Sequence, residues 1–171
     1  MDYTEAVAYL ERHIGQGVKP GLERIDALLD AMGRPEQGYP VVHVAGTNGK
    51  TSTARLVTLV LMGHGLTTGT YTSPHLQRVE ERLAINGRIA TEEEFALAVS
   101  DVAAFADLRE ASGGEPSAYF ELTTASAFAF FADQAVSAAV LEVGLGGRLD
   151  ATNVVEAEVC VVTTIGIEHT E

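Results

Sequence analysis

The stretch of the chain that decides the fold reads Val41-Val42-His43-Val44-Ala45-Gly46-Thr47-Asn48-Gly49-Lys50-Thr51-Ser52-Thr53. It opens with a short apolar run rich in β-branched residues, which predicts a buried strand. Residues 46–49 follow, a turn that tolerates positive φ and leaves backbone N–H groups free to face a ligand. A helical pattern begins after Lys50. The order of strand, glycine loop, lysine, hydroxyl and helix predicts a phosphate-binding site.

Each part of this loop has a chemical task in such a site. The loop amides and the helix N-terminus hold anionic oxygens, Lys50 neutralises a terminal phosphate, and a hydroxyl of Thr51 or Ser52 takes Mg²⁺. The match to the pattern G-x-x-x-x-G-K-[ST] is imperfect, because Val44 stands where the first glycine should be. The alternative interpretation is a glycine turn with a surface lysine before a helix. The candidate nucleotide-binding residues are Gly46, Thr47, Asn48, Gly49, Lys50, Thr51 and Ser52.

Charge and hydropathy exclude several classes of protein. The 171 residues carry 11 basic and 24 acidic side chains, a formal net charge of −13. Such a chain has no basic face for a phosphate backbone, which argues against nucleic acid as a partner. The overall field also repels ATP, so the phosphate site must rely on local donors. We expect neither a signal peptide nor a membrane partner, because no apolar run approaches the length of a span.

The only cysteine, Cys160, lies in the apolar run of residues 159–162. A packed core thiol is the expected role there, rather than a nucleophile. A single cysteine allows no disulfide within the chain, which fits a reducing, cytoplasmic location.

The rest of the chain alternates predicted helices and strands. The βαβ unit that starts at Val41 predicts parallel strands with a right-handed crossover, and the whole pattern predicts a parallel α/β sheet. Residues 73–88 are predicted to form a long loop, and loops of that length are usually functional. We expect helices over residues 2–14, 22–32, after Lys50 up to Gly63, from Thr91, and over 120–133, with strands from Val41 and over 66–72, 138–143 and 159–165.

The helix that starts at Thr91 carries the clearest boundary signal. Thr91-Glu92-Glu93-Glu94 is a capping box with acidic residues in the first turn. Its apolar face is predicted to hold Phe95, Leu97, Val99, Val102 and Phe105.

Three polar residues follow successive predicted strands. Ser73 comes after the second strand, Glu142 ends the third, and His169 follows the fourth. The carboxyl ends of parallel strands share one edge, the edge that also carries the glycine loop. A hydroxyl and a carboxylate beside bound phosphates suit Mg²⁺, although histidine is an unusual ligand for it. An ordinary strand-end carboxylate and a surface histidine are the alternatives.

Glycines 144, 146 and 147 do not form a dinucleotide fingerprint, because the spacing is G-x-G-G and no helix clearly follows. We expect them to allow close backbone approach to a ligand.

Several motifs resemble one known family. Residues 45–51 resemble the nucleotide loop of the Mur ligase superfamily, whose shorter loop accounts for Val44. Residues 141–153 are similar to the second signature of folylpolyglutamate synthases and bifunctional dihydrofolate synthases. Other segments match that family in order: Ser73-Pro74-His75-Leu76, Glu81-Arg82-Leu83 with Ile85-Asn86-Gly87, Tyr119-Phe120-Glu121 with Thr123, and Ile167-Glu168-His169-Thr170-Glu171.

The resemblance implies a fold and a reaction. The fold is a P-loop-type α/β architecture like the Mur ligase central domain. The activity is ATP-driven addition of L-glutamate to a folate or dihydropteroate carboxylate through an acyl phosphate, with Mg²⁺ and a monomeric enzyme. The implied residues are Lys50, Glu142 and His169 for catalysis, Thr51, Ser73, Glu142 and His169 for metal, and Ser73, His75, Arg82, Phe120, Asp150 and Ala151 for folate. Without the resemblance, Phe120 could be core and Asp150 could cap a turn.

Family members are more than twice as long as this chain. We therefore expect an N-terminal fragment, with a leading helical pair in residues 1–38 and an α/β core in 39–171, that lacks the C-terminal domain and has little ligase activity alone. A peptidoglycan-precursor Mur ligase is one alternative, against which residues 73–76 and 144–153 argue. A non-catalytic ATP- or folate-binding module is another. Phosphate release with and without glutamate separates these hypotheses.

Overall fold

The computed structural model describes residues 1–14 and 21–166. Within them lies a six-stranded sheet with the order β4-β3-β2-β5-β1-β6. The strands β2 (Thr68–Tyr71), β5 (Ala138–Glu142), β1 (Val41–Ala45) and β6 (Val159–Val162) run parallel to their neighbours. The short strands β3 (Leu83–Ile85) and β4 (Arg88–Ile89) are antiparallel. The predicted α/β class is confirmed, with a sheet that is mostly rather than wholly parallel.

The helix α3 (Lys50–Gly63) joins β1 to β2 as the predicted crossover. Those two strands are parallel but not adjacent, because β5 pairs with both and separates them. All five residues of β5 are buried. A strand buried on both faces takes the centre of a sheet, where helices cover it from either side.

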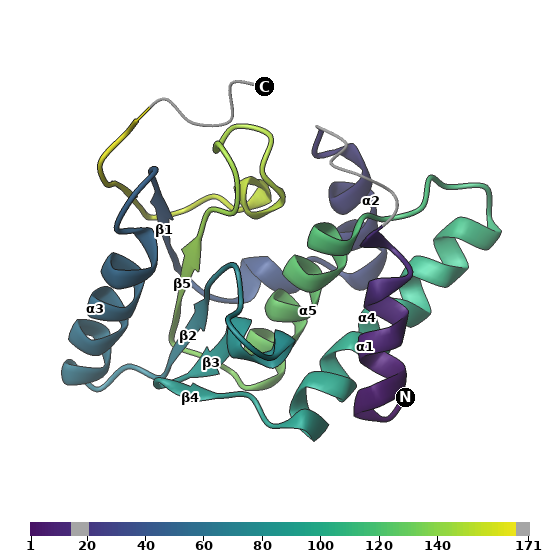
Figure 1. Cartoon of the computed structure of the whole chain (residues 1–171), viewed down its shortest axis with the longest axis horizontal. Coiled ribbons are helices and arrows are strands. Elements are labelled where there is room, and N and C mark those ends of the chain that lie inside the picture. The colour runs from purple at the N-terminus through teal and green to yellow at the C-terminus, as the bar shows by residue number, and fades with distance from the viewer. Residues whose placement is uncertain (15–20, 167–171) are drawn as a thin grey trace.

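Helices cover the two faces unequally. In Figure 1, α3 lies on one side of the sheet, and α5 (Tyr119–Asp133), α4 (Glu92–Ala111) and α1 (Tyr3–Glu11) lie on the other. The main core sits on the α5 side and includes the fully buried rings of Tyr71, Phe128 and Phe131. Replacing such a ring with alanine typically costs about 3–5 kcal/mol of stability.

The two helices predicted at the start of the chain are present as α1 and α2 (Glu23–Met32). Asp2 caps α1 by accepting a hydrogen bond from Glu5 N. Gly33 ends α2 in the left-handed conformation with φ 80°, as a C-terminal glycine should. The first helix ends three residues before the predicted boundary at Ile14, which is exposed.

The prediction of a long loop over residues 73–88 is wrong in its second half. That half holds the 3₁₀ turn Val79–Arg82, then β3 and the start of β4. Asn86 and Gly87 connect the two strands with φ values of 50° and 74°. An Asn-Gly pair with both residues at positive φ makes the tight hairpin turn that suits the twist of paired strands. The dipeptide was therefore a usable hairpin signal.

The capping box of α4 is confirmed: Thr91 Oγ1 accepts from Glu94 N at 3.1 Å, and Glu94 Oε2 accepts from Thr91 N at 2.7 Å. The predicted apolar face is partly wrong, since Leu97 is 60% exposed and Phe105 38% exposed. The buried stripe combines larger residues with small ones that let neighbouring helices approach closely: Phe95, Ala96, Ala98, Val99, Val102, Ala103 and Ala106.

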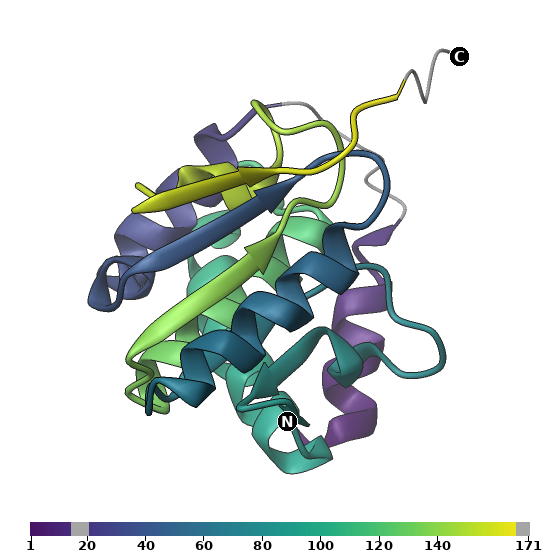
Figure 2. The same ribbon diagram turned by 90° about the vertical axis from the view of Figure 1, so that its left-hand side faces the viewer.

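The prediction that Cys160 is a core thiol is also wrong, because Cys160 is exposed. It lies on β6, which Figure 2 shows in yellow at the edge of the sheet beside β1. An apolar run predicts a buried strand only if other elements cover it. In the described part of the chain β6 is an edge strand, and Val159 and Val162 on it are also exposed. Among the described residues, no helix combines the length and the apolar character needed to cross a membrane.

Candidate functional site

The glycine loop between β1 and α3 adopts the backbone that its sequence requires. Gly49 precedes the first residue of α3 with φ 83°, and Gly46 has φ 137°. A Cβ at Gly46 would lie 2.0 Å from Thr163 Oγ1, far inside contact distance. Gly46 is therefore needed both for its backbone conformation and for space.

The segment after β6 braces this loop from one side. The Thr163 hydroxyl donates to the carbonyls of Ala45 and Asn48, at 3.2 and 2.8 Å. Thr47 N donates to Thr164 O at 2.8 Å, and Gly166 N donates to Thr47 Oγ1 at 3.1 Å. These bonds explain why β6 ends at Val162, earlier than predicted. No sequence signal marked Thr163, because its partners lie more than 110 positions away.

Lys50 begins α3, and its ammonium lies back over the loop. Nζ donates to Thr47 O at 3.3 Å, and the side chain is half-buried. This puts a positive charge beside the loop amides and the positive end of the helix dipole, where anionic oxygens bind.

Glu142 connects the loop to the end of β2. Thr51 Oγ1 donates to Glu142 Oε1 at 2.8 Å, and Ser73 N donates to Glu142 Oε2 at 3.2 Å. The carboxylate is 2% exposed. Its burial raises the pKa of Glu142, while the bonds from Thr51 and Ser73 act in the opposite direction. The structure thus brings Thr51, Ser73 and Glu142 together, as strand-end topology predicted.

The other predicted residues near this carboxylate have different outcomes. Ser52 is exposed, and the hydroxyl that reaches Glu142 belongs to Thr51. His169 lies outside the described residues. Within residues 1–14 and 21–166, no group of three or more His, Cys, Asp or Glu side chains is arranged to hold a metal ion. The available donors are one carboxylate and two hydroxyl-bearing residues, the oxygen chemistry that Mg²⁺ prefers when phosphates and water complete its shell.

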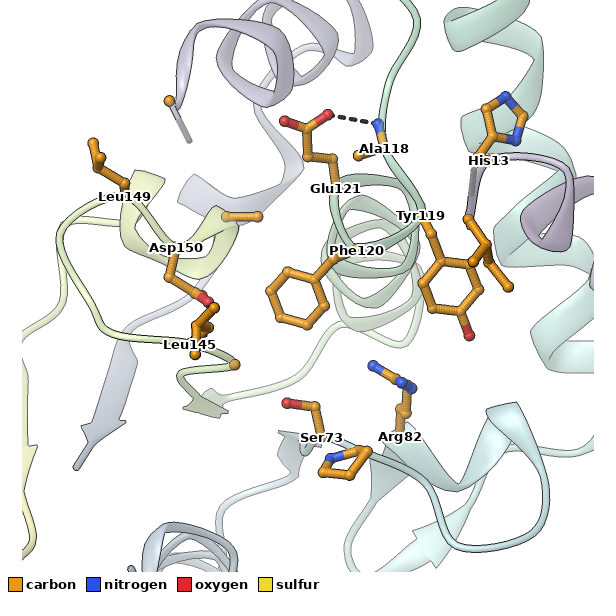
Figure 3. A pocket seen from close by; sticks show the side chains of 15 residues that line it. His13, Ser73, Arg82, Ala118, Tyr119, Phe120, Glu121, Leu145, Leu149 and Asp150 are labelled. Atoms are coloured by element: carbon orange, nitrogen blue, oxygen red, sulfur yellow. Dashed lines mark hydrogen bonds between the residues drawn. The ribbon is translucent and has the colours of Figure 1, made fainter. Parts of the chain in front are cut away.

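A cavity of about 660 Å³ opens next to Ser73. Figure 3 shows its side chains converging from the start of α5, the segment after β2 and the glycine-rich segment after β5. Five of the six residues predicted for folate line it: Ser73, Arg82, Phe120, Asp150 and Ala151. Residues that sequence reasoning missed also line it, among them His13, Ile14, Tyr119, Leu145 and Leu149.

Phe120 supplies an aromatic wall of the cavity at the start of α5. A Cβ at Gly144 would lie 2.5 Å from Phe120 Cζ, so only glycine leaves room for the ring. Gly144 thus allows close approach of the Phe120 ring. Close approach of glycines 144, 146 and 147 to a ligand stays a prediction. Glu121 beside it is buried and forms an ion pair with Arg24 of α2 at 2.8 Å, which joins the leading helices to the cavity wall.

Asp150 both lines the cavity and caps a turn, so the turn-capping interpretation is correct, and its role toward a ligand stays a prediction. The side chain is 6% exposed. Oδ2 accepts from Leu145 N at 2.8 Å, and Oδ1 accepts from Thr152 N at 3.0 Å. It precedes the 3₁₀ turn Ala151–Val154, and between the glycine motif and residue 166 there is no α-helix.

His75 is the predicted folate residue that does not line this cavity. It lies instead on a smaller neighbouring cavity of about 240 Å³. Arg82 Nε donates to His75 Nδ1 at 3.0 Å, and the Arg82 guanidinium lies 5.6 Å from the centre of the Tyr119 ring. Partial burial and then the Arg82 charge lower the pKa of His75, so a neutral ring accepts this hydrogen bond.

The fold and the loop together define an α/β nucleotide-binding domain of the phosphate-loop type. A scan against protein-family models found no match. The chain is 45% identical over 161 residues to the dihydrofolate synthase/folylpolyglutamate synthase of Mycobacterium tuberculosis, covering 90% of this chain and 33% of that protein.

Solved structures agree with this similarity. Mycobacterium tuberculosis folylpolyglutamate synthase complexed with ADP superimposes with a TM-score of 0.90 at 40% identity over 99% of this chain and 39% of that one. Escherichia coli FolC in complex with DHPP and ADP gives a TM-score of 0.89 at 37% identity, with the same coverage. The chain is a homologue of the folylpolyglutamate and dihydrofolate synthases, which confirms the resemblance seen in the motifs. It spans about a third to two fifths of the length of these relatives.

Proposed function

We propose that this chain is the ATP- and folate-binding part of a ligase that adds L-glutamate to the carboxylate of a folate or dihydropteroate. In this proposal residues 1–38 are a helical pair that closes one side of the substrate cavity, and residues 39–171 are the nucleotide-binding core. The enzyme acts as a monomer in the cytoplasm, where ATP and reduced folates meet.

One observation carries the proposal: the two oxygens of Glu142 contact the two halves of the site. Oε1 accepts from Thr51, at the start of the phosphate-loop helix, and Oε2 accepts from Ser73, which lines the large cavity. A terminal phosphate on the loop and a carboxylate at the mouth of the cavity are therefore neighbours. Proximity of the two reactants is the main requirement of phosphoryl transfer, which depends on positioning and charge stabilisation.

The reaction then has two steps. A substrate carboxylate oxygen attacks the γ-phosphorus of ATP, the bond to the β-phosphate oxygen breaks, and ADP leaves with an acyl phosphate remaining. The α-amine of glutamate attacks the acyl carbon, an amide bond forms, and inorganic phosphate and a proton leave. Lys50 and the loop amides stabilise the charge on the transferred group. No covalent enzyme intermediate is needed.

The donor set beside the phosphate loop fits Mg²⁺. Thr51, Ser73 and Glu142 would hold the ion, which supplies a positive charge that draws electron density from the transferring phosphoryl group. A buried carboxylate whose charged form is disfavoured by burial gains most from a cation at this position. A role for His169 in the same site remains a prediction.

The cavity suits a flat heterocycle that bears N–H donors. Phe120 and Tyr119 supply aromatic surface, Asp150 supplies a buried acceptor, and Arg82 supplies a cation toward a substrate carboxylate or ring carbonyl. The Escherichia coli relative with DHPP and ADP supports a folate-type ligand. It also favours a folate ligase over a peptidoglycan-precursor ligase. A non-catalytic binding module is the second candidate, because the chain matches only part of each relative.

The test is calorimetric titration of the chain with Mg·ATP, repeated with Lys50→Ala. We expect binding that the substitution abolishes. Arg109→Ala is the control, since it removes one positive charge from α4, on the opposite side of the sheet from α3. Equal binding by wild type and Lys50→Ala would contradict the proposal. Glutamate-dependent phosphate release in the presence of dihydropteroate then separates a ligase from a binding module.

A further inference from the structure

We propose that His43 and Thr152 are positioning residues that fix the carboxylate of Asp150 for recognition of the heterocycle, through a buried chain of hydrogen bonds from strand β1 to the cavity. This inference rests on the proposed function for its ligand but not for its geometry. The family resemblance described above assigns no role to His43 or Thr152.

The chain of contacts is continuous. His43 Nε2 lies 2.8 Å from Thr152 Oγ1, and Thr152 Oγ1 donates to Asp150 Oδ1 at 2.5 Å. His43 is 6% exposed and Thr152 fully buried, so water does not compete for either bond. His43 comes from the strand β1, whose position in the sheet is set by ladders to β5 on one side and β6 on the other. This chain of hydrogen bonds, here called the relay, thus ties a loop residue to a strand that is paired on both sides.

The protons that each side chain can donate determine the direction of the two hydrogen bonds, His43 to Thr152 and Thr152 to Asp150. A threonine hydroxyl has one proton to donate, and that proton goes to Asp150. Thr152 Oγ1 must therefore accept from His43, which requires a proton on Nε2 of the ring. Burial lowers the pKa of His43, which favours the neutral ring at physiological pH. The two bonds consequently point the same way, from His43 through Thr152 to the carboxylate.

The relay leaves one oxygen of Asp150 for a ligand. Oδ1 accepts from both the amide and the hydroxyl of Thr152, whereas Leu145 N is the one donor to Oδ2 within residues 1–14 and 21–166. Oδ2 also lies beside Gly144, a cavity-lining residue, where a Cβ would be 3.0 Å from it. A carboxylate oxygen can accept two hydrogen bonds. The structure therefore assigns Oδ2 as a single fixed acceptor for an N–H group of the bound heterocycle.

Matched variants separate a relay from simple packing. Thr152→Val keeps the shape but removes the hydroxyl, whereas Thr152→Ser keeps the hydroxyl and removes a methyl group. In the same way His43→Leu removes the ring donor, and His43→Gln restores a side-chain N–H near the position of Nε2. If His43 and Thr152 only fill space, the loss of dihydropteroate affinity should follow the side-chain volume that each variant removes. If they position Asp150, the loss of affinity should follow removal of the hydrogen-bond donor.

The first experiment is fluorescence titration with 7,8-dihydropteroate, with Mg·ATP calorimetry on the same samples. We expect Thr152→Val and His43→Leu to weaken dihydropteroate binding by about tenfold or more, the usual scale for a hydrogen bond to a charged group. Thr152→Ser and His43→Gln should recover most of the affinity, and Mg·ATP binding should not change. Equal affinity in Thr152→Val and Thr152→Ser would overturn the inference.

The second experiment needs no ligand, and its readout comes from the wild-type chain. The ¹⁵N shifts of the His43 ring in the wild-type chain, assigned by the signal lost in His43→Gln, report which nitrogen carries the proton. We expect a neutral ring protonated on Nε2 at pH 7. Protonation on Nδ1 alone, which leaves Nε2 without a proton to donate to Thr152, would overturn the relay. If the wild-type chain binds no dihydropteroate but shows the Nε2 tautomer, the proposed function fails while the relay stands.

Discussion

The phosphate loop and the large cavity beside Ser73 lie at the same edge of one sheet, but they are built in opposite ways. The loop is a continuous stretch between β1 and α3, and its shape follows from glycine and the first turn of a helix. The cavity combines side chains from several distant segments, including the end of α1, the segment after β2, the start of α5 and the loop after β5. A local motif specifies the first site, whereas helix packing assembles the second.

The largest effect should come from breaking the loop. Gly46→Ala places a methyl group against Thr163 at a positive φ, so we expect loss of Mg·ATP binding and a fall of about 1–3 kcal/mol in the free energy of unfolding. Urea denaturation and calorimetry measure the two effects. Gly63→Ala is the matched control, because a Cβ there meets nothing within 4 Å. Unchanged Mg·ATP binding and an unchanged free energy of unfolding in Gly46→Ala would show that the loop is not tightly constrained.

The second-largest effect should come from a change at Glu142, whose carboxylate contacts both sites. Glu142→Gln keeps the shape and a polar contact to Thr51 but removes the charge that would face Mg²⁺. We expect the Mg²⁺-dependent gain in ATP affinity to fall by about tenfold or more, with little change in ATP binding without metal. Titrations with and without Mg²⁺ give the difference. Asp133→Asn, at the exposed end of α5, is the control that should change neither.

A smaller and more selective effect is expected in the cavity. Phe120→Ala removes an aromatic wall that contacts Gly144, so dihydropteroate affinity should fall by about fivefold to tenfold. Mg·ATP affinity should stay the same, because the ring is outside the loop. Phe105→Ala, on the exposed face of α4, serves as the aromatic control. A parallel loss of ATP binding in Phe120→Ala would show that the two sites are not independent.

The smallest effect concerns the pH dependence of stability that arises from His43, the residue that links strand β1 to the cavity through Thr152. Burial lowers the pKa of His43 below its ordinary value, which is about 6.5. Below that pH the unfolded chain takes up a proton that the folded chain refuses, so unfolding is favoured. The stability from a neutral His43 is therefore present above about pH 6.5 and is lost as the pH falls. Urea denaturation between pH 7.5 and 5.5 should show a shallower loss in His43→Gln than in wild type; equal slopes would contradict this.

The difference between the two regions explains how far sequence reasoning reached. The positive φ values of the glycine loop, the helix after it and the capping box at Thr91 depend on residues within a few positions, and they form as predicted. The prediction of a buried Cys160 is wrong because burial depends on what covers a strand, which the strand's own residues do not encode. His75 does not line the large cavity, for a similar reason. His75 accepts a hydrogen bond from Arg82 and lines the smaller cavity, because membership of a sequence motif does not determine which side chain faces a cavity.

The sequence by itself determined the α/β class, the phosphate loop and the convergence of Ser73 and Glu142 at one sheet edge, because strand order along the chain and parallel pairing force those residues together. Only the tertiary structure decided that β5 separates β1 from β2, that Thr163 braces the loop, and that His43 reaches Asp150 through Thr152. These contacts join residues about 70 to 120 positions apart. They form only when packing has placed the elements, since no local pattern records a partner at that distance.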